Sequence, residues 1–327
     1  MKDSLGNTIP KNALIIRHTE VSDFRHCRLS WFVHSHNGLN LTPVLKSPKL
    51  KAGSIWHKGM EFHYAGATLE EGVHEGYNHE IESLEKVFGD ALYDVNIRAE
   101  LDESRDLALL VGEAYEEWAR TEAYPSDDNL RIVGVEQRYV VPVTAPNGRP
   151  TRIWLAAKLD GIVRYANMIW VMEHKFLAKS TRVDNPDHLP IDLQMGLQLI
   201  VLAKVFPGEP IGGAIYNIAR KQAPGPRVRS PLFGRHIVER PAHERRRLEC
   251  QLYHDAARMR LCKRSADAIY PNPQPFGGKC TWGCSARDVC EALQKEEDYL
   301  SLLNTQFVKR DRDIWQMLED ETEGGEL

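Results

Sequence analysis

An aspartate and a Glu-x-Lys triplet are the residues whose types and spacing suggest chemistry most directly. Asp160 ends a run of alternating strand residues, and Glu173-His174-Lys175 lies in the next expected strand. Positions i and i+2 of a strand face one side, so Glu173 and Lys175 share a face that a hairpin brings alongside Asp160. Two carboxylates there form a hard oxygen site suited to Mg²⁺ or Mn²⁺, with the backbone carbonyl of His174 as a further candidate ligand. A metal with a lysine beside it is suited to phosphodiester hydrolysis.

The surroundings of the triplet decide how much weight it carries. An Asp followed by Glu-x-Lys also occurs by chance on solvent-facing strands. Here the continuous apolar run Met168–Met172 directly precedes Glu173, which is typical of a strand buried on both faces. Charged residues that directly follow such a run are less often plain surface, so we interpret them as a site.

Four cysteines form a second constellation. Cys27 stands alone near the N-terminus, while Cys280, Cys284 and Cys290 follow one another closely near the other end. Four thiolates can hold a zinc ion or an iron–sulfur cluster. Zinc sites usually show two close pairs of cysteines rather than one and three. Cys250 and Cys262 have no comparable spacing, and we expect ordinary buried thiols there.

Composition bounds the class of protein. The 327 residues suffice for one large domain with insertions or for two domains, and 27% charged residues is ordinary for a globular protein. No apolar run approaches the ~20 residues of a membrane span, and the first residues hold no signal-peptide core. We therefore expect an intracellular protein without a membrane partner, whose six cysteines bind metal or stay free rather than pair as disulfides.

Positive charge is unevenly distributed. The chain carries a net charge of −4, but between Arg220 and Arg264 it has thirteen lysines and arginines against four acids. This stretch is either a solvated helix face with a charged loop or a surface that binds phosphates.

Strands alternate with helices along the chain, which predicts an α/β fold. Residues 14–36 open with an apolar pair and continue as a helix with Ser22 as its expected N-cap and Phe24, Cys27, Trp31 and Phe32 turned inward. We expect further helices at 54–66, 80–122, 191–206 and 242–264, strands at 132–142, 153–165, 168–176 and 213–219, and loops at 38–53, 186–190 and 224–234. The charged helical stretch at about 66–128 reads as an insertion.

Several short motifs, in order, resemble one family. Val21–Cys27 resembles a segment that bears a first cluster cysteine, and Gly53–Glu61 resembles a helix that carries the family histidine, here His57. Leu159–Gly161 and Met172–Lys175 resemble two metal-binding strands. Asp192–Gln198 resembles a Gln-x-x-x-Tyr helix, and the cysteine trio before Glu291 resembles a closing cluster segment. The ordered set resembles the PD-(D/E)XK nuclease superfamily, in its RecB-like branch with an iron–sulfur cluster. That branch includes the Cas-four family, AddB-type helicase–nucleases and many phage exonucleases.

The resemblance implies a fold and a domain layout. It implies a restriction-endonuclease-like mixed central sheet flanked by helices, with the helical insertion and a C-terminal iron–sulfur lobe. Residues 1–300 would form a single nuclease domain, in which 21–36 and 270–292 make the cluster lobe, and 301–327 would be a C-terminal tail.

The resemblance also implies roles for individual residues. Asp160, Glu173, His57 and His174 would hold Mg²⁺ or Mn²⁺, Lys175 would activate or orient water, and Gln194 would position the strand. Cys27, Cys280, Cys284 and Cys290 would hold a [4Fe–4S] cluster with a structural task. Arg220, Lys221, Arg227 and Arg229 would line a DNA channel, and Glu136 stands in the strand before Asp160, where the family often has a glutamate. Taken without the resemblance, His57 is better explained as a structural or surface residue, and Gln194 would be a helix-surface glutamine.

Two departures from the family pattern stand out. Gln198 replaces the tyrosine of the Gln-x-x-x-Tyr helix; its amide can touch a phosphate backbone but cannot stack on a base. Three residues separate Cys280 from Cys284, where the family often has two between its second and third cysteines.

The expected function is a metal-dependent DNA exonuclease of a prokaryotic or phage-infected cytoplasm, acting on single-stranded DNA or DNA ends in recombination or end processing. One alternative is a CRISPR-adaptation nuclease that trims spacer precursors. Another, of a different class, is a non-catalytic DNA-binding or assembly subunit that retains the cluster. Ring-forming relatives exist, so a homo-oligomer or a recombination partner protein is compatible with the resemblance.

Overall fold

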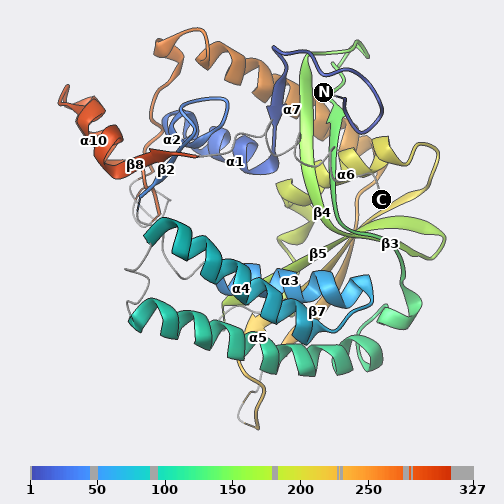
Figure 1. Cartoon of the computed structure of the whole chain (residues 1–327). Helices are drawn as coiled ribbons and strands as arrows, with labels where there is room; N and C mark the ends of the chain where they lie inside the picture. Colours follow the sequence, from blue (N-terminus) through green and yellow to red (C-terminus); the bar gives the residue numbers. More distant parts are fainter. Residues whose placement is uncertain are drawn as a thin grey trace. The chain divides into compact units, whose positions relative to one another are not determined.

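The chain divides into two compact units, which are described one at a time. The computed structural model describes residues 2–44, 51–88, 95–178, 183–226, 228, 231–274, 280 and 283–310 (Figure 1). The first unit comprises Met1–Lys46, Val140–Ala157 and Arg246–Leu327, and the second comprises Ser47–Tyr139 and Lys158–Arg245. The strands of the larger sheet are β1 (Leu14–Ile16), β3 (Arg131–Pro142), β4 (Ile153–Tyr165), β5 (Met168–Ala178), β6 (Ile211–Lys221) and β7 (Phe233–Glu239). Their order along the hydrogen-bond ladder is β1–β4–β5–β6–β7, with β3 also paired to β4, so the fold is a mixed α/β fold.

The sheet of the second unit is built around β5. The end of β4 (Ile153–Tyr165) pairs antiparallel with the start of β5 (Met168–Ala178), β5 pairs parallel with β6 (Ile211–Lys221), and β6 pairs antiparallel with β7 (Phe233–Glu239). Ala166 and Asn167 link β4 to β5 with φ angles of 49° and 61°, as a two-residue hairpin turn demands. The residues from Ile169 to His174 are buried, as the apolar run predicts.

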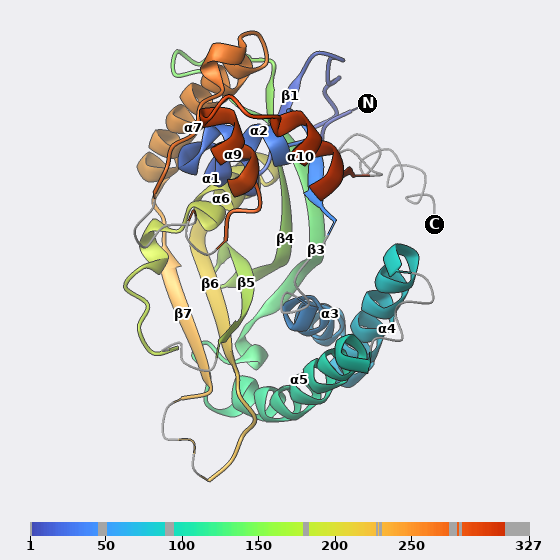
Figure 2. The same ribbon diagram turned by 90° about the vertical axis from the view of Figure 1, so that its left-hand side faces the viewer.

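Helices cover both faces of this sheet. α3 (Lys51–Ala65) packs on β5, α5 (Val95–Thr121) on β6, and α4 (Leu69–Phe88) against both of those helices (Figure 2). α6 (Leu193–Val205) packs on β5 and β6 as well. Even-numbered residues of β5 contact α3, where Trp56 stacks on Phe176 with ring centroids 4.7 Å apart, and odd-numbered ones contact α6. Because side chains alternate along a strand, α3 and α6 lie on opposite faces.

The first unit is mostly helical. β1 (Leu14–Ile16) runs parallel to the first residues of β4, and α1 (His18–His26) and α2 (Arg28–His34) follow it. The C-terminal part supplies most of α7 (Ala242–Cys262), then α9 (Arg287–Gln294) and α10 (Tyr299–Gln306). A small apolar cluster of Cys27, Leu29, Val33, Ala286, Val289 and Phe307 joins α2 to α9.

Several expectations need correction. The first helix begins at His18 with Arg17 as its N-cap, so Ser22 lies inside the helix and caps nothing. β7 begins within the stretch expected as a loop at 224–234, and the described residues of the stretch expected as a helix at 80–122 belong to α4 and α5. Residues 307–309, expected within a tail, form β8 and pair with β2 (Leu41–Pro43). Among the described helices, none combines the length and apolarity that a membrane span requires.

Candidate functional site

The candidate site lies where two paired strands part. Hydrogen-bonded pairing between β4 and β5 runs from Tyr165 opposite Met168 to Gly161 opposite Met172. Asp160 and Glu173 are the next residue on each strand. Beyond this point β5 continues against β6 through Ala178. Asp160 and Glu173 therefore lie at neighbouring positions just past the paired part of the two strands.

Three side chains converge there as candidate metal ligands. Each of His57, Glu136 and Asp160 has a candidate ligand atom within 4.8 Å of those of the other two. Among the described residues, this is the only such group of three histidine, cysteine or acidic side chains. His57 Nδ1 is 3.3 Å from Asp160 Oδ2, which also accepts a hydrogen bond of 3.0 Å from the backbone N–H of His174. An imidazole nitrogen and two carboxylates suit Mn²⁺ or Mg²⁺, so the residues present fit such an ion.

Glu136 reaches this group through an unusual backbone. It lies in β3 (Arg131–Pro142) with a φ of 53°, in the left-handed region that residues with a side chain rarely adopt. The Lys158 ammonium forms an ion pair with its carboxylate. Strained backbone that persists often marks a functional site. The sequence pointed to Glu136 only through the family pattern, because nothing in the local sequence predicts the left-handed backbone that directs its side chain toward His57 and Asp160.

Glu173 is held differently from Asp160. Its side chain is 1% exposed. Lys175 Nζ pairs with Oε1, which also accepts a hydrogen bond of 2.7 Å from Gln194 Nε2, while Gln198 Nε2 donates to Oε2 at 3.2 Å. Gln194 Oε1 accepts from Lys175 Nζ at 3.0 Å. Both oxygens of Glu173 are thus bonded to α6, and this carboxylate lies outside the group formed by His57, Glu136 and Asp160.

The two α6 glutamines therefore have structural partners in the site. Gln194 joins Glu173 and Lys175 and is positioned by the Asp192 cap at the start of α6. Gln198 is 2% exposed, and its amide also donates to the Lys158 carbonyl at 3.1 Å. A buried amide with these bonds does not face a DNA phosphate. The amide of Gln198 therefore binds Glu173 and the Lys158 carbonyl.

Burial and charge separate the pKa values of the two acids. Burial would raise the pKa of Asp160, but the hydrogen bond and charge of His57 outweigh it and hold that pKa below its usual value. Burial, reinforced by the charge of Asp160, raises the pKa of Glu173 to about 7. Burial would lower the pKa of His57, but the hydrogen bond and charge of Asp160 outweigh it and raise that pKa. The site thus favours an ionised Asp160 beside a cationic partner.

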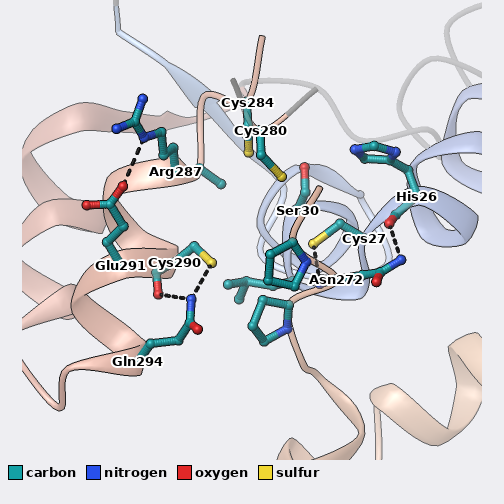
Figure 3. A pocket seen from close by; sticks show the side chains of 14 residues that line it. His26, Cys27, Ser30, Asn272, Cys280, Cys284, Arg287, Cys290, Glu291 and Gln294 are labelled. Atoms are coloured by element: carbon teal, nitrogen blue, oxygen red, sulfur yellow. Dashed lines mark hydrogen bonds and ion pairs between the residues drawn. The ribbon is translucent and has the colours of Figure 1, made fainter. Parts of the chain in front are cut away.

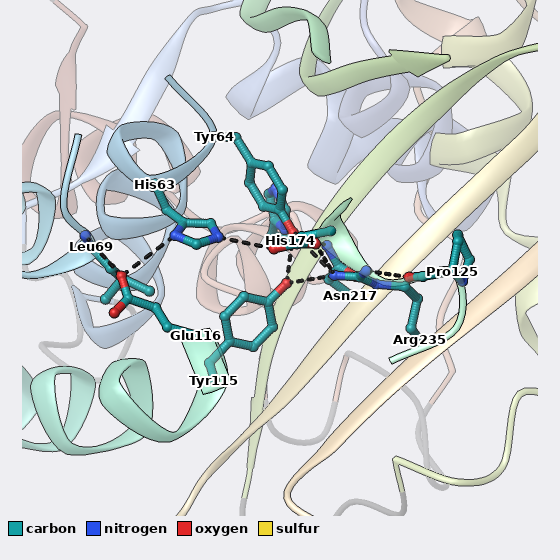
Figure 4. Close-up of polar contacts among 10 residues, drawn as sticks. His63, Tyr64, Leu69, Tyr115, Glu116, Pro125, His174, Asn217 and Arg235 are labelled. Atoms are coloured by element: carbon teal, nitrogen blue, oxygen red, sulfur yellow. Dashed lines mark hydrogen bonds and ion pairs between the residues drawn. The ribbon is translucent and has the colours of Figure 1, made fainter. Parts of the chain in front are cut away.

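His174 faces the opposite side of β5 from Glu173, against a buried polar network. Its ring stacks on Tyr64 of α3 with centroids 5.1 Å apart, and burial lowers its pKa to about 3. The centre of this network is Arg235 of β7, which donates to Asp127 at 2.8 Å and to the hydroxyls of Tyr64 and Tyr115 (Figure 4). Arg235 also donates to the Asn217 amide oxygen and to the Pro125 carbonyl. Sequence reasoning missed this network, since its members are single polar residues far apart in the chain.

A cavity of about 690 Å³ opens beside the candidate ligands. His57, Asp160 and Glu136 line it together with Glu61, Glu75, His79, Glu80 and the cations Lys58, Arg138 and Lys158. Glu61, one turn after His57 on α3, pairs with Lys58 at 2.8 Å. The mixture of carboxylates and cations around this cavity suits a phosphate-bearing ligand next to a bound metal.

All four singled-out cysteines line one cavity of the first unit. Cys27, Cys280, Cys284 and Cys290 surround about 380 Å³ together with segments of 271–273 and α9 (Figure 3). N–H groups of Asn272, Gln274 and Gln294 point at three of the sulfurs, at 3.5, 3.2 and 3.2 Å. N–H donors to sulfur favour thiolates, so the donor set fits a metal or cluster held by cysteines. Cys250 and Cys262 do not line this cavity.

The four residues expected to contact DNA differ in burial and in whether the structure describes them. Arg220 is buried and donates to the Pro231 carbonyl at 3.5 Å, which does not favour the DNA contact expected of it. Lys221 is half-buried, with its ammonium 5.5 Å from the centre of the Phe176 ring. Arg227 and Arg229 lie outside the described residues.

The fold and site together define a class. A mixed sheet flanked by helices, with carboxylates and a histidine gathered where two strands part, is the architecture of a metal-binding hydrolase. The chain belongs to the PD-(D/E)XK nuclease superfamily, whose family model matches residues 17–291. No curated protein matches it significantly. Membership in this nuclease superfamily, expected from the ordered motifs, is thereby confirmed; the match does not resolve the branch within it.

Proposed function

We propose that this protein is a divalent-metal-dependent DNA exonuclease that hydrolyses single-stranded DNA or DNA ends. The observation that carries the proposal is the convergence of His57, Glu136 and Asp160 at the parting of β4 and β5, beside the Glu173–Lys175 pair. A metal site next to a half-buried lysine that Glu173 and Gln194 hold in place suits phosphodiester hydrolysis.

The roles of the residues follow from their contacts. His57, Asp160 and Glu136 would hold Mg²⁺ or Mn²⁺, which when bound supplies Lewis acidity and a water of lowered pKa. Burial disfavours the charged form of Lys175, but Glu173 outweighs it and raises the pKa, so the ammonium stays charged. A charged Lys175 can hold the attacking oxygen or offset charge that develops on the phosphate. Gln194 and Gln198 fix Glu173, and through it Lys175.

For the cysteine cavity we propose a [4Fe–4S] cluster. A tetrahedral zinc site has Zn–S bonds of about 2.3 Å, which puts its sulfurs roughly 3.8 Å apart. Among the described residues, no three cysteine sulfurs lie within 4.8 Å of one another. The wider spacing and the N–H donors support the larger group. Its task would be structural, joining α2 to the segment around α9, and not hydrolysis.

The experiment that tests the exonuclease assignment compares labelled ends. Protein purified without oxygen is incubated with Mg²⁺ or Mn²⁺ and with single- and double-stranded DNA labelled at the 5′ or the 3′ end. We expect mononucleotides or short products to be released progressively from one labelled end, and a circular single strand to be spared. Cutting of the circle at the rate of the linear strand would contradict an exonuclease and would leave an endonuclease.

A further inference from the structure

The exposed face of α7 is cationic. The described exposed residues of this helix include Arg246, Arg247, His254 and Arg258, with Gln251 between them, and Lys263 and Arg264 follow directly. At 100° per residue, Arg247, Gln251, His254 and Arg258 fall on one stripe. Arg258 is 64% exposed at its side chain. From Arg246 to the end of the helix this face is about 24 Å long.

The acids of α7 do not neutralise this face. Asp255 is buried, with its side chain 10% exposed, and accepts from Arg25 of α1 at 2.7 Å. Glu249 accepts from the backbone N–H of Thr144 at 2.8 Å and is half-buried. Arg258 approaches Asp255 only at 3.9 Å. Glu244, in the first turn, is the acid of α7 that is exposed. Asp255 and Glu249 thus have structural partners, whereas Arg246, Arg247 and Arg258 are exposed.

Like charges also gather near the end of α7. Arg260 donates to the Arg152 carbonyl, so two guanidinium-bearing residues meet. Burial lowers the pKa of Arg260, and the charges of Arg264 and Arg152 lower it further. Mutual repulsion among cations is unfavourable in the free protein and is relieved when a polyanion binds.

The other long surface helices have the opposite charge. α4 has six glutamates against Lys86, and the acids of α5 outnumber its arginines. The positive face is therefore not a general property of the surface helices in this acidic protein. Charge segregation of this kind is the electrostatic footprint of a nucleic-acid contact.

We propose that the outward face of α7, with Arg247 and Arg258 on its stripe and the exposed Arg246 flanking them, binds the phosphate backbone of DNA independently of sequence, at a site separate from the metal centre. Over the ~24 Å of this face, duplex DNA presents about 14 phosphate charges. The arginines, together with Gln251 and His254 between them, supply hydrogen-bond donors suited to phosphate oxygens. The inference shares with the proposed function only the premise that DNA is the substrate.

The test is the salt dependence of DNA binding. Anisotropy of a fluorescein-labelled 30-base-pair duplex is measured against full-length protein over a range of KCl concentrations, with EDTA present so that nothing is cut. The variant Arg246→Gln/Arg247→Gln/Arg258→Gln should reduce the magnitude of the slope of log affinity against log salt by about 2.7, and weaken binding about 500-fold near 0.1 M salt relative to its effect at 1 M. Gln251→Lys should steepen the slope by about 1.

A matched control removes three cations elsewhere. Arg98→Gln/Arg120→Gln/Lys295→Gln takes the same charge from exposed positions on α5 and after α9. Its slope should stay within about 0.5 of the wild-type slope. Equal slopes in the α7 variant and the control, whether both changed or both unchanged, would overturn the inference. Because cleavage plays no part in this assay, a wild type that binds through α7 but cuts no DNA would refute the proposed function alone.

Discussion

At the scale of single residues, the site rests on two different ways of holding a carboxylate. Asp160 faces His57 and a backbone N–H and is kept ionised. Glu173 is bonded on both oxygens by α6 and Lys175, and its pKa of about 7 reflects its burial. The chain thus combines an open ligand with a closed, preorganised acid, a division that the sequence motif Asp…Glu-x-Lys does not reveal.

Glu136 provides a test of the ligand group. Changing Glu136 to Gln keeps the shape but removes the charge, so Mn²⁺ should bind about ten- to a hundredfold more weakly. Calorimetric titration of the protein with Mn²⁺ measures this without reference to activity. Glu82→Gln, a change to an exposed acid of α4, is the control and should leave Mn²⁺ affinity unchanged. Wild-type affinity in Glu136→Gln would remove this residue from the group.

Gln198 should act as a positioning residue. Changing it to Leu leaves Glu173 Oε2 without its amide partner, so Glu173 and Lys175 lose their fixed geometry while no substrate contact is lost. We expect kcat to fall about ten- to a hundredfold and KM for DNA to stay the same. Gln137→Leu, at an exposed position of β3, serves as the control. A rise in KM at constant kcat would instead indicate that Gln198 touches the substrate.

At the scale of elements, the buried network ties α3 and α5 to β6 and β7. Arg235, 1% exposed at its side chain, pairs with Asp127 in the 3-10 helix Asp127–Asn129 and bonds the hydroxyls of Tyr64 and Tyr115. Tyr64 in turn stacks on His174. The network therefore fixes the helical face against which the strand of the Glu-x-Lys triplet packs.

Asp127→Asn should lower stability in a pH-dependent way. Burial would raise the pKa of Asp127, but His63 and Arg235 outweigh it, so the folded pKa lies below the ordinary value of 3.8. Such a group stabilises the fold fully above pH 3.8 and loses its contribution as the pH falls through the folded pKa. We expect the variant to unfold about 3 kcal/mol more easily at pH 7 and the difference to shrink below pH 4. Chemical denaturation at several pH values measures it; a constant difference would argue against an ionised Asp127.

Much of the second unit's fold was predictable from sequence, and the reasons are local. β4 and β5 were placed from alternating and continuous apolar runs, and α6 from its apolar period and the following Pro-Gly break. β7 was missed because Phe233–Glu239 has few apolar residues, of which Ile237 is exposed and the adjacent Val238 buried, beside a Pro- and Arg-rich stretch. Asp160, Glu173, Lys175 and Gln194 were predicted from motifs. The backbone of Glu136 and the Arg235 network depend on tertiary contacts with no sequence signal.

At the scale of the whole molecule, the candidate metal site and the cysteine cavity belong to different units. The candidate metal ligands all lie in the second unit and the cysteine cavity lies in the first. Cys27 is separated from the other three cysteines by most of the sequence. A group held by all four would join the N-terminal and C-terminal segments of the first unit, and closing so long a loop restricts the unfolded chain strongly.

Replacing a single cysteine tests whether the four cavity cysteines bind the proposed cluster or are ordinary thiols. Cys27→Ser should lose iron, sulfide and visible absorbance after anaerobic purification, and should melt at a lower temperature. Cys250→Ser is the matched control, since Cys250 is half-buried and does not line the cavity, and it should keep the full iron content. Equal iron content in the two variants, or zinc in place of iron in the wild type, would refute the [4Fe–4S] assignment.

The measurement that tests the central claim most directly is DNA cleavage by Asp160→Ala in Mn²⁺. Loss of this ligand removes the charge that pairs with His57 and anchors the metal, so the rate on end-labelled single-stranded DNA should fall about a thousandfold. Retained DNA binding and an unchanged melting temperature would show that the variant is folded. A folded Asp160→Ala protein that degrades DNA as fast as the wild type would contradict the account.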